Sequence, residues 1–133
     1  MSLIHWRETE LLHPIPELHE SRRKFVELVN AMEGAEDGQL RVMFLRLLAH
    51  VEHWLERENR LMEEYGFPDQ RRHRHEHEQL INEVRYLLQR IENGLFSLGH
   101  TYVKARLPQW FRSHGEEMDS AFHDYLLATR KAA

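Results

Sequence analysis

Apolar residues at helical spacing constrain the fold of this chain more than any other feature of its sequence. His73 and His77 lie four residues apart, and the same helical face continues as an apolar row: Leu80, Ile81, Val84, Leu87, Leu88 and Ile91. This spacing predicts a helix over residues 69–93 that buries one side and carries both histidines in its first two turns. The two histidines are either inward-facing groups that need partners or a solvated, polar helix end.

Three further segments have the same periodicity, and none alternates as a half-buried strand would. They predict helices over residues 17–33, 39–65 and 101–130, with breaks at Gly34, Gly66-Phe67-Pro68 and Asn93-Gly94. Pro108 falls inside the last segment and predicts either a kink or a later start. Residues 1–16, with Pro14 and Pro16, predict an extended arm packed on the body. The expected fold is therefore all-α: an antiparallel up-down-up-down four-helix bundle with an N-terminal arm, in a single domain over residues 1–133.

The composition of the chain excludes several functional classes and limits the kinds of metal site it can form. The net charge of −4 offers no basic surface for nucleic acid, and no apolar run approaches the ~18 residues of a membrane span. The first six residues are followed at once by charged ones, which does not fit a signal peptide, so we expect a cytoplasmic protein. The chain has 11 histidines and no cysteine. Any metal must therefore be held by imidazole and carboxylate, a donor set that suits iron, manganese or zinc.

Two more polar residues interrupt the predicted inner faces. Glu58 falls in the apolar row of the second helix, and His114 falls in that of the fourth. In an antiparallel bundle, both can lie at the same level as His73 and His77. Imidazoles and a carboxylate that converge in a bundle interior describe a non-haem metal site.

The sequence resembles the hemerythrin family, including the bacterial hemerythrins, in several short segments along the chain. The matching pieces, in order, are Ile15-Pro16-Glu17-Leu18, Leu28-Val29-Asn30, Glu58 with Leu61-Met62, Tyr65-Gly66-Phe67-Pro68, His73-x3-His77, Trp110-x3-His114-x4-Asp119, and Tyr125-Leu126. Each piece is weak alone, but their order and spacing together are specific.

The resemblance implies a four-helix bundle that holds two irons and binds O2 reversibly. It assigns His73, His77 and His114 to the first iron, and Glu58 and Asp119 to the bridge between the irons. His114 and Asp119 are five residues apart, about 140° round a straight helix, so their pairing rests on the resemblance alone.

The positions that match the second iron's histidines hold Arg22 and Trp54. Either this second site is lost and about one metal binds, or His19, His50 or His53 rebuilds it. For His53, a π-bulge between residues 53 and 58 would be needed to turn it onto the face of Glu58. We expect the Trp54 ring to be buried against Arg22 or Phe25.

Four further histidines match no motif and are interpreted as surface or arm residues: His5, His13, His100 and His123. We expect a non-enzymatic protein that binds iron, one or two ions, with zinc or manganese as alternatives. Its expected partner is O2 or another small diatomic ligand, with no nucleic acid and no membrane. Two alternatives stay open: an oxidase, peroxidase or NO-handling enzyme on the same site, and a metal-free interaction bundle.

Overall fold

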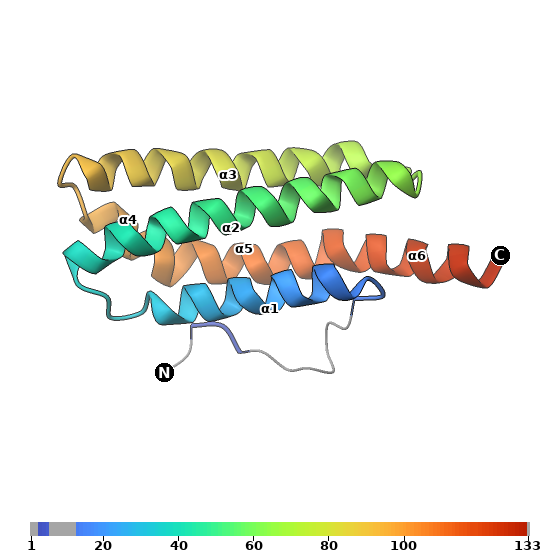
Figure 1. Cartoon of the computed structure of the whole chain (residues 1–133), viewed down its shortest axis with the longest axis horizontal. Helices are drawn as coiled ribbons and strands as arrows, with labels where there is room; N and C mark the ends of the chain where they lie inside the picture. Colours follow the sequence, from blue (N-terminus) through green and yellow to red (C-terminus); the bar gives the residue numbers. More distant parts are fainter. Residues whose placement is uncertain (1–2, 6–12, 133) are drawn as a thin grey trace.

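The protein is a bundle of four helices, shown in Figure 1. This computed structural model describes residues 3–5 and 13–132. The first three helices are α1 (Pro16–Ala31), α2 (Asp37–Glu64) and α3 (Gln70–Glu92). The fourth is one continuous helical run made of α4 (Ser97–Thr101), η1 (Tyr102–Arg106), α5 (Leu107–His114), η2 (Gly115–Asp119) and α6 (Ser120–Ala132).

Each successive helix runs back along the one before it, as the sequence colours in Figure 1 show. Helix α2 packs against both α1 and α3. No strand occurs in residues 3–5 or 13–132. The predictions of an all-α chain and of a four-helix bundle are therefore confirmed. The predicted bounds of the first three helices are close to the observed ones, and the fourth begins at Ser97 rather than near residue 101.

The core lies between the helices and is built from the apolar rows. On α3, Leu80, Val84, Leu87, Leu88 and Ile91 expose no more than 7% of their surface, while Ile81 is only partly buried. Glycines in the left-handed conformation follow two of the helix ends, Gly66 with φ 65° and Gly94 with φ 81°. Within the described part of the chain, no helix is both long and apolar enough to span a membrane.

The described part of the N-terminal arm is tied to α1. The backbone N–H of Ile4 donates to Asn30 Oδ1 at 2.8 Å, and Asn30 Nδ2 donates to the Ile4 carbonyl at 2.9 Å. Ile4 is buried, and residues 3–5 and 13–15 are not helical. Pro16 begins α1, where its missing N–H costs nothing. The rest of the predicted arm, residues 1–2 and 6–12, lies outside the described residues.

The fourth helix does not start late at Pro108. It begins at Ser97, and the residues just before Pro108 widen into the π-helical turn η1. Proline has no N–H to donate, and its ring clashes with a carbonyl one turn back, so a widened turn keeps the helix continuous. A second π-helical turn, η2, follows His114 directly. It changes which side chains share a face near the candidate site.

Candidate metal centre

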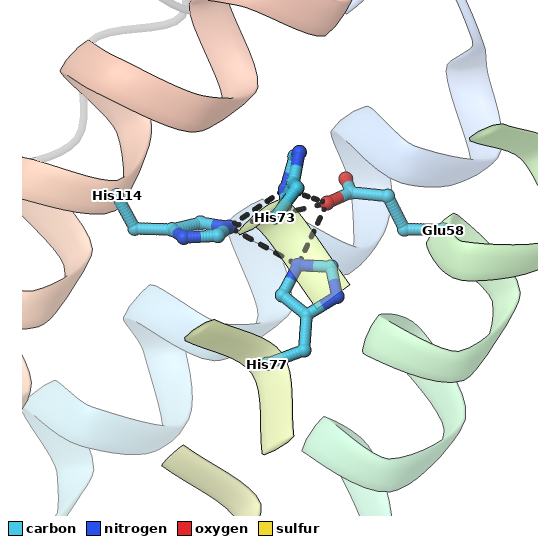
Figure 2. Close-up of side chains that lie close together, drawn as sticks. All are labelled: Glu58, His73, His77 and His114. Atoms are coloured by element: carbon cyan, nitrogen blue, oxygen red, sulfur yellow. Dashed lines mark hydrogen bonds and ion pairs between the residues drawn. The ribbon is translucent and has the colours of Figure 1, made fainter. Parts of the chain in front are cut away.

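Four buried side chains from three helices converge at one level of the core (Figure 2). Glu58 comes from α2, His73 and His77 from α3, and His114 from the end of α5. None exposes more than 1% of its surface. Helical spacing explains the placement, because each of the four replaces an apolar residue in its inward-facing row.

The ligand-type atoms of this cluster lie close together. His114 Nε2 is 3.1 Å from His73 Nε2 and 3.2 Å from His77 Nε2. Glu58 Oε1 is 2.7 Å from His73 Nε2 and 3.0 Å from His77 Nε2. Two ligand atoms bound at right angles to one ion, each about 2.1 Å from it, are about 3 Å apart. The spacing of the cluster therefore suits a single cation at its centre.

Outer hydrogen bonds fix which nitrogen of each ring faces inward. His77 Nδ1 donates to Asn59 Oδ1 at 2.7 Å, and His114 Nδ1 donates to Glu76 Oε1 at 2.9 Å. A neutral imidazole that donates from Nδ1 has an unprotonated Nε2. Both Nε2 lone pairs therefore point into the cluster, the arrangement that metal-binding histidines usually show.

A bound cation would compensate for the electron-rich atoms that face one another in this cluster. Burial lowers the pKa of His77 to about 4, against the effect of the nearby Glu58 carboxylate, so its ring is neutral at pH 7. Lone pairs and a carboxylate then face one another. Neither Glu58 oxygen has a well-formed hydrogen bond to any described residue. The donor set therefore fits a bound metal ion.

Asp119 joins the cluster through the π-helical turn. Its Oδ1 lies 3.2 Å from His73 Nε2 and 3.1 Å from His114 Nε2. A straight α-helix would place His114 and Asp119 on different faces, but η2 spans Gly115–Asp119 and widens the turn between them. This local π-helix is the physical reason why two residues five positions apart meet.

A comparison with known proteins gives the family. A bacteriohemerythrin from Ralstonia nicotianae is 31% identical to this chain over 102 residues, which cover 77% of this chain and 74% of that protein. The chain belongs to the hemerythrin family. No protein-family model matches it. The relative and the His/Glu cluster together support hemerythrin-like metal binding in this chain.

An arginine and a tryptophan lie beside the cluster. Arg22, on α1, is 1% exposed and forms an ion pair from Nη1 to Asp119 Oδ2. Trp54, on α2, is fully buried, with its ring 5.4 Å from Phe25 and 6.1 Å from Trp110. The prediction that Trp54 is buried against Arg22 or Phe25 is confirmed through the Phe25 contact.

None of the histidines suggested as replacement ligands belongs to the four-residue cluster. His53 is exposed, because α2 is α-helical throughout residues 53–58 and lacks the π-bulge that would turn it inward. His50 donates from Nε2 to the Ser21 carbonyl at 2.8 Å and stacks on Trp54. His19 is half-buried on α1, and the four-residue cluster does not include it.

The burial of His13 narrows its sequence interpretation as a surface or arm residue. His13 belongs to the arm, as expected, but it is not a surface residue, since only 8% of it is exposed. The Ile15 N–H donates to His13 Nδ1 at 3.1 Å, and the ring packs 5.8 Å from that of Phe122. Burial lowers the pKa of His13 to about 4. Its Nδ1 is an acceptor, so its Nε2 carries the proton and has no lone pair for a metal.

Two supporting residues, Asn59 and Glu76, were not predicted from the sequence. Each directly adjoins a cluster residue in the sequence, Glu58 and His77 respectively, and each orients one of the rings. A polar residue adjacent to a candidate ligand was the available signal, but the chain is 30% charged, so such neighbours are common.

Proposed function

We propose that this hemerythrin holds iron at Glu58, His73, His77, His114 and Asp119, and binds O2 or another small ligand there. The observation that carries the proposal is that two unprotonated imidazole nitrogens converge on a buried carboxylate. Iron suits imidazole and carboxylate donors and supplies redox chemistry, and five side chains leave one position of a six-coordinate ion for the ligand.

Arg22 and Trp54 support a site with one iron. The guanidinium of Arg22 is already a cation paired with Asp119. A second metal ion beside it would place two cations against one carboxylate. The Trp54 ring fills the neighbouring space against Phe25 and Trp110. These two residues stand where the family resemblance expects the histidines of the second iron.

The chain's own residues position and shield the site. Glu76 and Asn59 hold the rings of His114 and His77 in the tautomers whose Nε2 atoms face inward. Trp110 stacks on His114, with ring centroids 4.4 Å apart and planes 12° apart, and restricts that ring further. Complete burial of the cluster keeps bulk water from its polar atoms.

Metal analysis of freshly purified protein, with an optical spectrum in air, tests the proposal. We expect about one iron per chain, without the near-ultraviolet and visible absorption of an oxo-bridged iron pair. A spectrum that changes reversibly between argon and air indicates ligand binding, as expected for a carrier. Two irons per chain contradict the single-iron proposal, and zinc or manganese in place of iron contradicts the choice of metal.

The same preparation separates the alternatives. Continuous turnover with a reductant and O2, peroxide or NO identifies an enzyme on this site. Protein that stays folded and takes up no metal after incubation with ferrous, zinc and manganous salts is a metal-free interaction bundle, and that result overturns the proposed function.

A further inference from the structure

Arg22 has an unused hydrogen-bonding edge inside the protein. Only its Nη1 engages Asp119. Its Nε and Nη2 are buried and have no hydrogen-bond partner among residues 3–5 and 13–132. These two N–H groups lie side by side on one edge of the planar guanidinium, a fork that matches the two oxygens of a carboxylate or a similar oxyanion.

Two neighbours, Gly115 and Phe111, pack closely against the guanidinium of Arg22. At Gly115 an added Cβ would lie 3.0 Å from Arg22 Nη2, so a larger residue there would push against the guanidinium. The ring of Phe111 lies beneath Arg22, 4.9 Å from Cζ to the ring centroid. Gly115 and Phe111 also line a cavity of about 410 Å³, bounded on other sides by residues 3–5, Arg112 and Glu116. Arg22 does not itself line this cavity, which extends to the two residues that its guanidinium contacts.

The charges of the loaded site call for one more negative charge. Among the buried groups, the proposed divalent ion and Arg22 contribute three positive charges, and Glu58 and Asp119 contribute two negative ones. The half-buried Glu76 carboxylate, on the outer side of His114, is not included in this count. A net positive charge remains in a buried position, where uncompensated charge is costly. Arg112 and Glu116 at the cavity wall offset each other. One small monoanion would offset the net positive charge of these buried groups.

We infer that the small-ligand site includes an oxyanion subsite, in which a small monoanion with two acceptor oxygens binds the Nε and Nη2 edge of Arg22. The inference rests on the proposed function, because the charge balance includes the metal ion. It makes Arg22 a specificity-determining residue that favours an oxyanion over a spherical anion of the same charge.

Formate is a suitable probe, because it is small, carries one charge, has two oxygens and is redox-inert. Isothermal titration calorimetry of formate into the metal-containing protein, in low-chloride buffer at pH 7, measures its affinity. Replacing Arg22 with Gln removes a charge-assisted hydrogen-bonding pair, and we expect affinity to fall at least about tenfold. Arg22→Lys keeps the charge but lacks the planar fork, so we expect it to bind formate more weakly than the wild type.

Gly115→Ala tests the same edge without changing any charge. Its Cβ would displace Nη2, and we expect weaker formate binding at unchanged metal content. The matched control is Gly38→Ala, because a Cβ at this other helical glycine meets no atom within 4 Å. A second control is Arg23→Gln, which alters the adjacent arginine, whose partners are the exposed Glu20 and Glu27. Both controls are expected to bind formate as the wild type does.

The outcomes separate this inference from the proposed function. Equal formate affinity in wild type and Arg22→Gln, at equal metal content, overturns the oxyanion subsite and leaves the metal site standing. Equal affinity for chloride and formate in the wild type also overturns it. Wild-type protein that takes up no metal overturns the proposed function itself. If Arg22→Gln does not fold, the oxyanion subsite is tested by comparing Gly115→Ala with Gly38→Ala. Equal formate affinity in those two variants overturns the inference.

Discussion

The two sides of the candidate metal centre have opposite hydrogen-bonding character: one presents acceptors and the other presents donors. The histidine side, formed by His73, His77 and His114, directs ring nitrogens inward, and two of those rings are fixed by outward hydrogen bonds. The arginine side, formed by Arg22 and Trp54, contains N–H groups: Arg22 Nε and Nη2 and Trp54 Nε1 are buried without partners among the described residues. Acceptors suit a cation, and donors suit an anion or a ligand with acceptor atoms.

The comparison shows how a bundle can change one side of a metal site while keeping the other. Both sides are anchored in long helices whose apolar rows fix their register, so neither depends on loop geometry. A guanidinium on the arginine side satisfies Asp119, which a metal would otherwise neutralise. Removing Arg22 without a substitute would leave a buried carboxylate with less compensation, which is destabilising.

The largest effect is expected on the histidine side. His77→Ala removes a ring that lies 3.0 Å from Glu58 Oε1 and 3.2 Å from His114 Nε2. We expect bound metal to fall sharply and the free energy of unfolding to decrease, because a ligand is lost and a buried gap is left. Metal content by elemental analysis and urea denaturation measure both. His53→Ala, at an exposed histidine of α2, is the control, and metal content equal to wild type in His77→Ala would refute the ligand assignment.

The second prediction concerns a double variant in which both residues of the arginine side are replaced by histidine. Arg22→His combined with Trp54→His supplies two imidazoles and removes the cation and the bulky ring. We expect iron uptake to rise from about one toward two ions per chain, with new near-ultraviolet and visible absorption. Arg23→His with Glu56→His adds two histidines on the same helices, at a half-buried and an exposed position outside the cluster, and is expected to leave the stoichiometry unchanged. A double variant that still binds one iron would show that Arg22 and Trp54 do not limit the stoichiometry.

The fold and most of the cluster could be predicted because helical periodicity determines both. Four apolar rows set the number of helices, and Glu58, His73, His77 and His114 occupy core positions of those rows. Whether the five candidate residues bind metal remains a prediction that the experiments above address.

Periodicity could not reveal the features that depart from a regular α-helix. Spacing alone separates His114 from Asp119, and only the π-helical turn η2 brings them together. A π-bulge in α2 would be needed to turn His53 inward, but the widened turns occur in the fourth helix, before Pro108 and after His114. The burial of His13 was missed for a related reason. The arm has no repeating pattern from which an inward face can be read.

A smaller effect is expected where the histidine side is supported from outside. Glu76→Gln keeps the size of the side chain but replaces the carboxylate that accepts from His114 Nδ1. Loss of such a supporting partner lowers metal affinity by roughly 10- to 100-fold in other sites, and we expect a change near the lower end. Competition with a metal chelator measures it. Glu78→Gln, on the exposed face of α3, is the matched control, and equal affinities in the two variants would contradict this role.

The smallest predicted effect concerns His13, and it appears as a pH dependence of stability. The pKa of His13 is lowered to about 4 from 6.5, mainly by burial. The unfolded chain therefore binds a proton at a pH where the folded chain does not, so acid favours unfolding. The contribution to stability is present above pH 6.5 and is lost progressively as the pH falls toward 4. For this pair of values, linkage gives a loss of about 0.7 kcal/mol between pH 7 and pH 6.

His13→Asn isolates this contribution. Asparagine supplies a side-chain oxygen that can accept from the Ile15 N–H, as His13 Nδ1 does, but it does not titrate. We expect the variant to lose less stability than wild type between pH 7 and pH 6, by about 0.7 kcal/mol in urea denaturation. Taking the difference between the two proteins cancels the titration of the metal ligands, which both share. His5→Asn, at an exposed histidine of the same arm, should follow the wild type. Parallel pH profiles for His13→Asn and wild type would mean that His13 is not buried and neutral in solution.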